Sequence, residues 1–270
     1  MLFSDYQKID AVNWSTLKEM RRSPLHYLYR SNHPIADNPR LALGRATHTA
    51  VFEPDRFLLD YALFSGPKRS GKAWKKCLSD NPGKTILKSS EYETCLAIRD
   101  AVRSHPIAGP ALLPPGEAEK VLTWTDAYTG INCKARLDWY RPGLFADLKT
   151  TVTVHPDRFG MVAARMGYHC QVAFYRAGLI ANGLDAPAPR IISVEVAPPH
   201  DVAVFVVDED VIYTAEQELK ELLSKVSAGR FSGQWPGSAL EEQPLKLPGW
   251  AYGPIDMEGD DDLAGLQISN

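Results

Sequence analysis

The residues best suited to chemistry are two carboxylates and one lysine that lie close together in the chain. Asp138 and Asp147 are separated by eight residues, and Lys149 follows after one more. Two carboxylates at close range repel each other unless a cation lies between them, and Mg²⁺ and Mn²⁺ prefer oxygen ligands. Such an ion polarises a phosphate and lowers the pKa of its bound water. The spacing therefore indicates metal-assisted phosphodiester hydrolysis, with Lys149 orienting or deprotonating the attacking water.

A three-stranded antiparallel meander is predicted to position these side chains. Segments with high strand propensity, separated by turn residues, cover residues 121–125, 131–140 and 144–150. The turn at Arg141-Pro142-Gly143 folds the second hairpin so that Asp138 and Asp147 approach each other. Two carboxylates and a lysine can therefore converge at one end of this hairpin.

Side chains alternate between the two faces of a strand, which assigns each residue of the meander to one face. Asp147 and Lys149 share a face, and Leu148 lies on the opposite one. On the preceding strand Lys134, Arg136 and Asp138 share one face, and the other is predicted to be the core side: Cys133, Ala135, Leu137 and Trp139. Because outer sheet faces are commonly polar, the spacing alone also fits an exposed surface without a site.

The rest of the sequence predicts helices before and after the meander. Apolar periodicity, capping residues and prolines place helices at residues 15–23, 41–52, 89–104, 156–182 and 210–228, and further strands at 191–196 and 203–207. Residues 65–90 are rich in Lys, Gly and Ser and are interpreted as a mobile basic loop with a short helix around Trp74. This order predicts an α/β (α+β) fold, in which helices flank a mixed central sheet and an N-terminal helical part precedes it.

Composition is that of a globular protein, with 44% hydrophobic and 23% charged residues. Residues 1–252 are expected to form a single domain, followed by an acidic, disordered tail over 253–270. The sequence contains neither an apolar run of about 18 residues nor a secretory signal, so we expect a cytoplasmic protein without a membrane partner. The four cysteines include no CxxC pair, which disfavours a zinc ribbon.

The charge is distributed unevenly, although the net charge is only −3. Residues 1–103 contain 17 Lys and Arg against 11 Asp and Glu, whereas residues 201–270 contain 4 against 14. The basic N-terminal part can supply a phosphate-binding face while the acidic end stays away from it. The same asymmetry also fits a pattern that serves solubility alone.

Five segments occur in an order that resembles the PD-(D/E)XK nuclease superfamily. They are Leu43-Gly44-Arg45-Ala46-Thr47-His48, Ala118-Glu119, Cys133-Lys134-Ala135-Arg136-Leu137-Asp138-Trp139, Ala146-Asp147-Leu148-Lys149-Thr150-Thr151 and Tyr168-His169-Cys170-Gln171-Val172-Ala173-Phe174-Tyr175. More closely, residues 13–250 resemble the RecE-type (exonuclease VIII-like) phage recombination exonucleases, which are similar to lambda exonuclease. Leu137 stands where the superfamily's name has a proline. The resemblance implies a restriction-endonuclease-like core.

The resemblance also implies roles for individual residues. Catalytic roles are implied for Asp138, Asp147, Lys149, Glu119 and Gln171. Metal binding is implied for His48, Asp138, Asp147, Glu119 and the backbone carbonyl of Leu148, with one or two Mg²⁺ ions per site and Mn²⁺ as a substitute. Gln171 and Tyr175 match a QxxxY motif, and their i, i+4 spacing lets both reach one site from a helix.

Contacts to DNA are expected from Ser15, Arg22, Ser23, Lys134, Arg136 and Tyr175. Similar phage exonucleases hold the 5′ phosphate with Arg and Ser groups near the N-terminus, and arginine matches phosphate oxygens with two hydrogen bonds. Ser15, Arg22 and Ser23 are the candidates for that role in this chain. A helix cap followed by solvated arginines is the alternative interpretation.

The activity implied by the resemblance is 5′→3′ digestion of double-stranded DNA ends, which leaves 3′ overhangs for phage-type homologous recombination. It further implies a ring-shaped homo-oligomer (a trimer or tetramer), a single-strand annealing partner of the RecT/Bet type, and a phage or prophage gene in a bacterial host. One alternative is an endonuclease or a Cas4-like nuclease, although the widely spaced cysteines disfavour an iron–sulfur cluster. A second alternative is a non-catalytic DNA-end-binding protein.

Overall fold

A mixed sheet runs through the centre of the protein, in the strand order β3-β4-β5-β6-β7. Within the part of the chain that the computed structural model describes, residues 3–36 and 38–248, its strands are β3 (Glu117–Thr125), β4 (Asn132–Arg141), β5 (Leu144–Thr151), β6 (Arg190–Glu195) and β7 (Val202–Val206). The first three form the predicted antiparallel meander, β6 joins β5 in parallel, and β7 returns antiparallel. The predicted mixed α/β fold is therefore confirmed.

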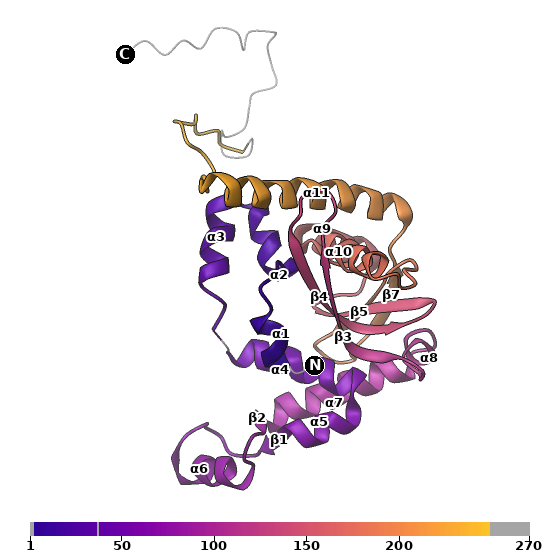
Figure 1. Ribbon diagram of the computed structural model, residues 1–270. Coiled ribbons are helices and arrows are strands. Elements are labelled where there is room, and N and C mark those ends of the chain that lie inside the picture. Colours follow the sequence, from indigo (N-terminus) through magenta and orange to yellow (C-terminus); the bar gives the residue numbers. More distant parts are fainter. Residues whose placement is uncertain (1–2, 37, 249–270) are drawn as a thin grey trace, which may run out of the picture. The chain divides into compact units, whose positions relative to one another are not determined.

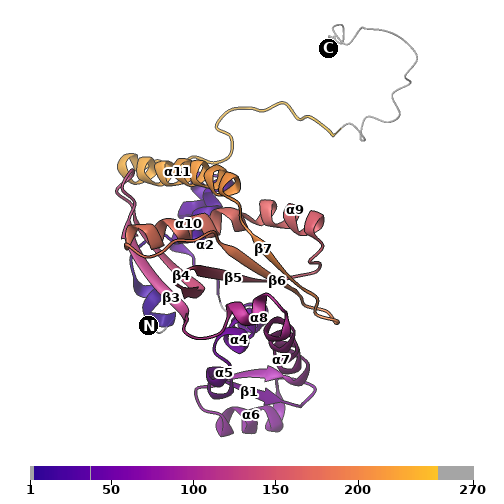
Figure 2. The same ribbon diagram turned by 90° about the vertical axis from the view of Figure 1, so that its right-hand side faces the viewer.

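Helices cover both faces of this sheet (Figures 1 and 2). One face packs against the N-terminal helices α2 (Trp14–Leu17), η1 (Lys18–Arg21) and α3 (Pro24–Asn32) and the later helices α9 (Pro156–Met166), α10 (Tyr168–Ala181) and α11 (Glu209–Ser232). The other packs against α4 (Pro39–Phe52), α7 (Ser89–Ser104) and α8 (Ala108–Ala111). Two apolar layers therefore enclose most of the sheet, and Thr123, Thr125 and Asn132 of the β3–β4 hairpin stay exposed.

The predicted helix over residues 156–182 is interrupted at Gly167. This residue has φ of +71°, a left-handed conformation that glycine adopts without strain, and it ends α9 and precedes α10. A Cβ at this position would lie 2.7 Å from both the Trp14 ring and the Arg21 guanidinium. The break therefore lets the N-terminal part pack closely against the start of α10.

The alternation of faces along β4 shifts by one position at Asp138. Leu137 packs with the α10 face, as predicted, but Trp139 packs in the opposite layer, where its ring lies 6.3 Å from that of Phe52. The predicted shared face of Leu137 and Trp139 is therefore wrong. The register places Glu119 opposite Asp138, and Glu119 has φ of +56°, which interrupts the regular pleat of β3 at this level.

Residues 61–88 contain regular structure where a loop was expected. Strand β1 (Tyr61–Phe64) pairs in parallel with β2 (Thr85–Lys88), and α6 (Gly71–Asp80) connects them. The predicted short helix around Trp74 is confirmed, but the flanking strands were not predicted. Helix α5 (Pro54–Asp60) precedes this unit, and α1 (Phe3–Lys8) begins the described chain.

Of the described residues, those up to Gly237 form one compact unit, and residues 238–248 belong to a second one. The expected acidic tail over 253–270, and the expected domain boundary before it, lie outside the described residues. Among the described helices, none combines the length and the apolar character that crossing a bilayer requires.

Candidate active site

Strand β5 supplies a carboxylate and a lysine on one face, as the period-2 pattern predicts. Lys149 Nζ lies 2.5 Å from Asp147 Oδ2, and Asp147 is almost completely buried. Leu148 points to the opposite side, into the layer formed by α4 and α7. Burial lowers the pKa of Lys149, but the Asp147 and Asp138 carboxylates together outweigh that effect and raise it. Lys149 is therefore a charged donor rather than a neutral base.

Asp138 reaches the same site because β4 and β5 separate there. Their pairing ends at Trp139 and Ala146, so the next opposed positions are Asp138 and Asp147. Asp138 Oδ2 accepts a hydrogen bond of 2.8 Å from the Leu148 backbone N–H. The N–H and C=O of one strand residue point toward the same neighbouring strand. The Leu148 carbonyl therefore also points toward the β4 side, where the predicted metal ligands lie.

His48 and Glu119 complete a cluster around Asp138. His48 projects from the middle of α4, and its Nδ1 lies 3.3 Å from Asp138 Oδ1. The three groups each offer one ligand atom within 4.8 Å of the others. Glu119 also forms an ion pair with Arg136, which faces the same cluster from β4. The structure thus brings together the predicted metal ligands His48, Glu119 and Asp138.

Helix α10 contributes Gln171 and Tyr175, one turn apart. Gln171 Oε1 accepts from Lys149 Nζ at 2.9 Å, and its Nε2 donates to Asp147 Oδ1 at 3.2 Å and to Tyr175 Oη at 2.7 Å. A lysine can only donate, so the amide oxygen must face Lys149 and the amide nitrogen must face Asp147. Gln171 therefore fixes both the lysine and the carboxylate.

The carboxylates of this cluster fit a divalent cation. Burial raises the pKa of Glu119 to about 7, with a further contribution from the Asp138 charge, and burial raises that of Asp147 to about 6. Burial also raises the pKa of Asp138, but His48, Lys149 and the Leu148 N–H together outweigh it and hold that pKa below its usual value. Burial thus disfavours the ionised form of Glu119 and Asp147, and a hard cation with oxygen ligands would stabilise that form.

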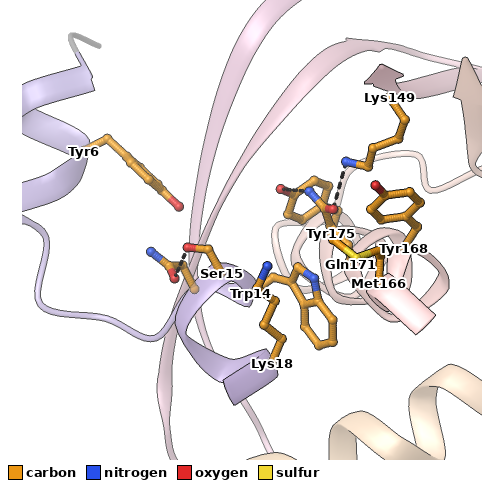
Figure 3. Close-up of a pocket in the computed structure, with 10 residues that line it drawn as sticks. Tyr6, Trp14, Ser15, Lys18, Lys149, Met166, Tyr168, Gln171 and Tyr175 are labelled. Atoms are coloured by element: carbon orange, nitrogen blue, oxygen red, sulfur yellow. Dashed lines mark hydrogen bonds between the residues drawn. The ribbon is translucent and has the colours of Figure 1, made fainter. Parts of the chain in front are cut away.

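A cavity of about 290 Å³ opens beside Lys149 (Figure 3). Its walls come from α1, α2, η1 and α10 and from the residues around them: Tyr6, Asn13, Trp14, Ser15, Lys18, Lys149, Met166, Tyr168, Gln171 and Tyr175. Lys149 Nζ lies 4.8 Å from the centre of the Tyr168 ring. Lys149 therefore stands between the carboxylate cluster and a polar cavity with aromatic walls.

The predicted DNA contacts near the N-terminus separate into two groups. Ser15 and Tyr175 line the cavity, whereas Arg22 and Ser23 do not. Ser23 is buried and caps α3, with its Oγ 2.6 Å from His26 Nδ1. The helix-cap interpretation therefore describes Ser23, and Arg22 pairs with Glu19 outside the cavity.

The predicted DNA contact of Lys134 is wrong for a physical reason. This side chain is buried, and its Nζ donates to the backbone carbonyls of Tyr6, Gln7 and Ile9 at 3.0, 3.3 and 2.7 Å. A lysine has three N–H donors, and these carbonyls use all of them. Lys134 holds the end of α1, whose Tyr6 lines the cavity. Arg136 pairs with Glu119, and its contact with DNA stays a prediction.

Sequence reasoning missed Lys18, which adds a second cation to the cavity. Burial lowers the pKa of Lys18, and the nearby Lys149 charge acts in the same direction. Its position three residues after Ser15 on a helical turn was the only available signal, because the cavity forms from segments far apart in sequence. Tyr6 and Trp14 were missed for the same reason.

The fold and the site define a class of protein. A mixed sheet that carries Asp138, Asp147 and Lys149 where two strands separate is the core of a PD-(D/E)XK nuclease. Residues 13–244 match the family described as a PDDEXK-like domain of unknown function (DUF3799), and the chain belongs to this family.

Among solved structures, the chain is similar to that of a "putative exonuclease" from Eubacterium rectale, with 16% sequence identity and a TM-score of 0.59. The alignment covers 91% of this chain and 93% of that one, and at this identity it shows a shared fold. The structure of SSO0001 matches with 12% identity over 82% of this chain and 87% of that one, but its TM-score of 0.29 supports no conclusion. No curated protein matches the chain.

Proposed function

We propose that this protein is a divalent-metal-dependent exodeoxyribonuclease that acts on the ends of double-stranded DNA. The observation that carries the proposal is the position of Lys149. Its ammonium is fixed by Asp147 and Gln171 and lies between the carboxylate cluster and the cavity of about 290 Å³. A phosphodiester placed there would meet a metal site on one side and a fixed cation on the other.

His48, Glu119, Asp138, Asp147 and the Leu148 carbonyl would hold the metal, for which we propose Mg²⁺. When bound, such an ion supplies an activated water and neutralises charge on the phosphate. Lys149 donates hydrogen bonds and so stabilises the negative charge that develops at the phosphate. Gln171 and Tyr175 keep Lys149 and Asp147 in place, which lowers the reorganisation needed during the reaction.

The cavity favours action at a strand end. Its far wall is formed by Tyr6, Trp14 and neighbouring residues of the N-terminal segment, so a strand that enters past Lys149 meets a barrier. Aromatic side chains stack on nucleobases of any type, and Lys18 and Ser15 suit a terminal phosphate. We therefore propose that a terminal nucleotide occupies the cavity and that its phosphodiester lies at Lys149.

We further propose 5′→3′ polarity, a 3′ overhang as product, a ring-shaped homo-oligomer and a single-strand annealing partner in recombination. These finer proposals depend on the resemblance to RecE-type exonucleases. The related fold of the Eubacterium rectale protein supports the exonuclease assignment through that protein's description.

Digestion of blunt duplex DNA, labelled separately at the 5′ and 3′ ends, tests the proposal. Wild type, Asp147→Ala and Lys149→Ala are compared in Mg²⁺ and in EDTA, with Lys225→Ala on α11 as the matched lysine control. We expect metal-dependent release of the 5′ label by wild type and by the control only. Cleavage in EDTA, or full activity of both site variants, would refute a metal-dependent nuclease built on these residues.

The same digestion distinguishes the finer alternatives. Early release of the 3′ label would refute the polarity, and cleavage of covalently closed circular duplex would identify an endonuclease. Light scattering after size-exclusion chromatography tests the ring, because a strict monomer contradicts it.

A further inference from the structure

A strongly basic unit lies apart from the catalytic cluster. Residues 61–88, which we call the basic lobe, comprise β1, α6 and β2 and form one end of the α4–α7 layer (Figures 1 and 2). The lobe contains seven Lys and Arg residues against one acidic residue, Asp80: Lys68, Arg69, Lys72, Lys75, Lys76, Lys84 and Lys88. This concentration of charge is large for a unit of its size.

The lobe is a fixed framework. Arg69 forms an ion pair with Glu91 at the start of α7 and also donates to the Ile86 carbonyl. The Phe64 and Trp74 rings meet edge to face, with centroids 5.1 Å apart. Lys84 Nζ donates to the Leu58 carbonyl at 3.0 Å, which ties the lobe to α5. These contacts hold α6 in place on the rest of the protein.

Three lysines of this framework have no partner within residues 3–36 and 38–248: Lys68, Lys72 and Lys75 make no ion pair or side-chain hydrogen bond there, and all three are exposed. Lys76 pairs with Asp80 at 2.7 Å. Lys72 lies three and four residues before Lys75 and Lys76, and like charges at these spacings destabilise a helix. Helix α6 has no fully buried residue, and the half-buried Trp74 supplies its ring contact with Phe64.

We propose that the basic lobe binds the phosphate backbone of duplex DNA beyond the end that enters the active site. The inference rests on the proposed nuclease function. A groove beside the lobe is lined by Trp74 and Leu78 of α6 and by Pro39 and Ala42 of α4. His48 lies six residues after Ala42 on the same helix, about 9 Å along its axis.

This separation suits a DNA duplex. Double-stranded DNA carries one negative charge per about 1.7 Å of its axis, so a duplex whose end lies in the site presents a few phosphates within the roughly 9 Å between His48 and the groove, and more beyond it. Lysine is a compact point charge that contacts phosphate without specifying a sequence. The basic lobe would therefore hold DNA of any sequence and increase affinity without entering the chemistry.

The salt dependence of binding gives the sharpest test. Each neutralised phosphate changes the slope of log K against log salt by about −0.9. Replacing Lys68, Lys72 and Lys75 by Gln retains helix propensity, and it should reduce the steepness of the slope by about 2 to 3. The affinity for duplex DNA should then fall on the order of 10²-fold near 0.1 M salt.

Binding is measured by fluorescence anisotropy of a labelled duplex in EDTA, between about 50 and 200 mM KCl. The matched control replaces Lys220, Lys225 and Arg230 of α11 by Gln, which makes the same charge change at the opposite end of the compact unit (Figures 1 and 2). An unchanged slope and Kd in the lobe variant, or an equal loss in the α11 variant, would overturn the inference.

Two further measurements distinguish a failure of the lobe proposal from poor folding of the triple variant and from a failure of the nuclease proposal. Lys68→Gln alone lies outside α6, so it should change the slope by about 1 even if the triple variant folds poorly. Mg²⁺-dependent cleavage by wild type is measured in parallel. If the lobe variants change the salt slope but wild type does not cleave DNA, the nuclease proposal is refuted and DNA binding by the lobe stands. If wild type cleaves DNA but the lobe variants leave the salt slope unchanged, only the proposal for the lobe is refuted.

Discussion

Replacing Gln171 by leucine tests whether the site depends on the fixed position of Lys149. The Gln171 amide bonds to Lys149 at 2.9 Å, to Asp147 at 3.2 Å and to Tyr175 at 2.7 Å. Leucine is similar in size but makes none of these bonds. Lys149 would then keep only its ion pair with Asp147 and its contact with the Tyr168 ring, on a flexible four-carbon stem.

The magnitude follows from the hydrogen bond to the charged lysine. Such a bond contributes about 1.5–3 kcal/mol, and each loss of about 1.4 kcal/mol in transition-state stabilisation is tenfold in rate. We therefore expect kcat of Gln171→Leu to fall about 10- to 100-fold. The variant also leaves the buried Tyr175 hydroxyl without its Gln171 donor, so a lower melting temperature should accompany the loss.

Gln171→Glu separates positioning from folding. A glutamate can still accept from Lys149, but it cannot donate to Asp147 and places a second carboxylate beside it. Both variants are compared with wild type by single-turnover digestion of end-labelled duplex in Mg²⁺ and by thermal unfolding. A folded Gln171→Leu protein with unchanged kcat would refute the positioning role, and so would full activity of Gln171→Glu.

Three further predictions concern stability. Lys134→Met should lower the free energy of unfolding by about 1–3 kcal/mol, because the backbone carbonyls at the end of α1 lose their donor. It should also raise KM, because Tyr6 in the cavity wall is then no longer held in place. Denaturant titration measures the first effect and steady-state kinetics the second. Gly167→Ala should cost about 1–2 kcal/mol or more in a thermal melt, since it adds left-handed strain and a contact of 2.7 Å to Trp14. In EDTA, the folded protein holds the protons of Glu119 (pKa about 7) and Asp147 (pKa about 6) more tightly than the unfolded chain does. This tighter proton binding stabilises the folded protein at low pH, and the stabilisation is lost as pH rises through these two pKa values. Adding Mg²⁺ should therefore raise the melting temperature more above pH 7 than at pH 5, and an equal gain at both would contradict the assigned ligands.

Strand periodicity was sufficient to predict one half of the site. Asp147 and Lys149 had to share a face, and a short turn between β4 and β5 had to place Asp138 opposite Asp147, because register follows from turn length. The pattern could not predict that the two strands separate at this point. That separation lets Asp138 accept the Leu148 N–H.

Local irregularities limited the prediction elsewhere. The positive φ at Glu119 shifts the alternation of faces, and a glutamate carries no sequence signal for that conformation. Gly167 gave an ambiguous signal, since an isolated glycine is tolerated inside helices, and only its contacts with Trp14 and Arg21 explain the break between α9 and α10.

The cavity depends on contacts between distant parts of the chain, and Lys134 illustrates why its walls could not be predicted. A lysine on a strand beside two other polar residues favours an exposed, DNA-binding interpretation. In the structure the N-terminal segment covers it, with Val12 bonded to Asn132 and to the Lys134 backbone and the Lys134 ammonium bonded to the end of α1. Covering that lysine places Tyr6 across the cavity from Lys149. Lys134 therefore serves the site by fixing one wall of the cavity, and the proposal that a strand end is favoured over an internal phosphodiester depends on that wall.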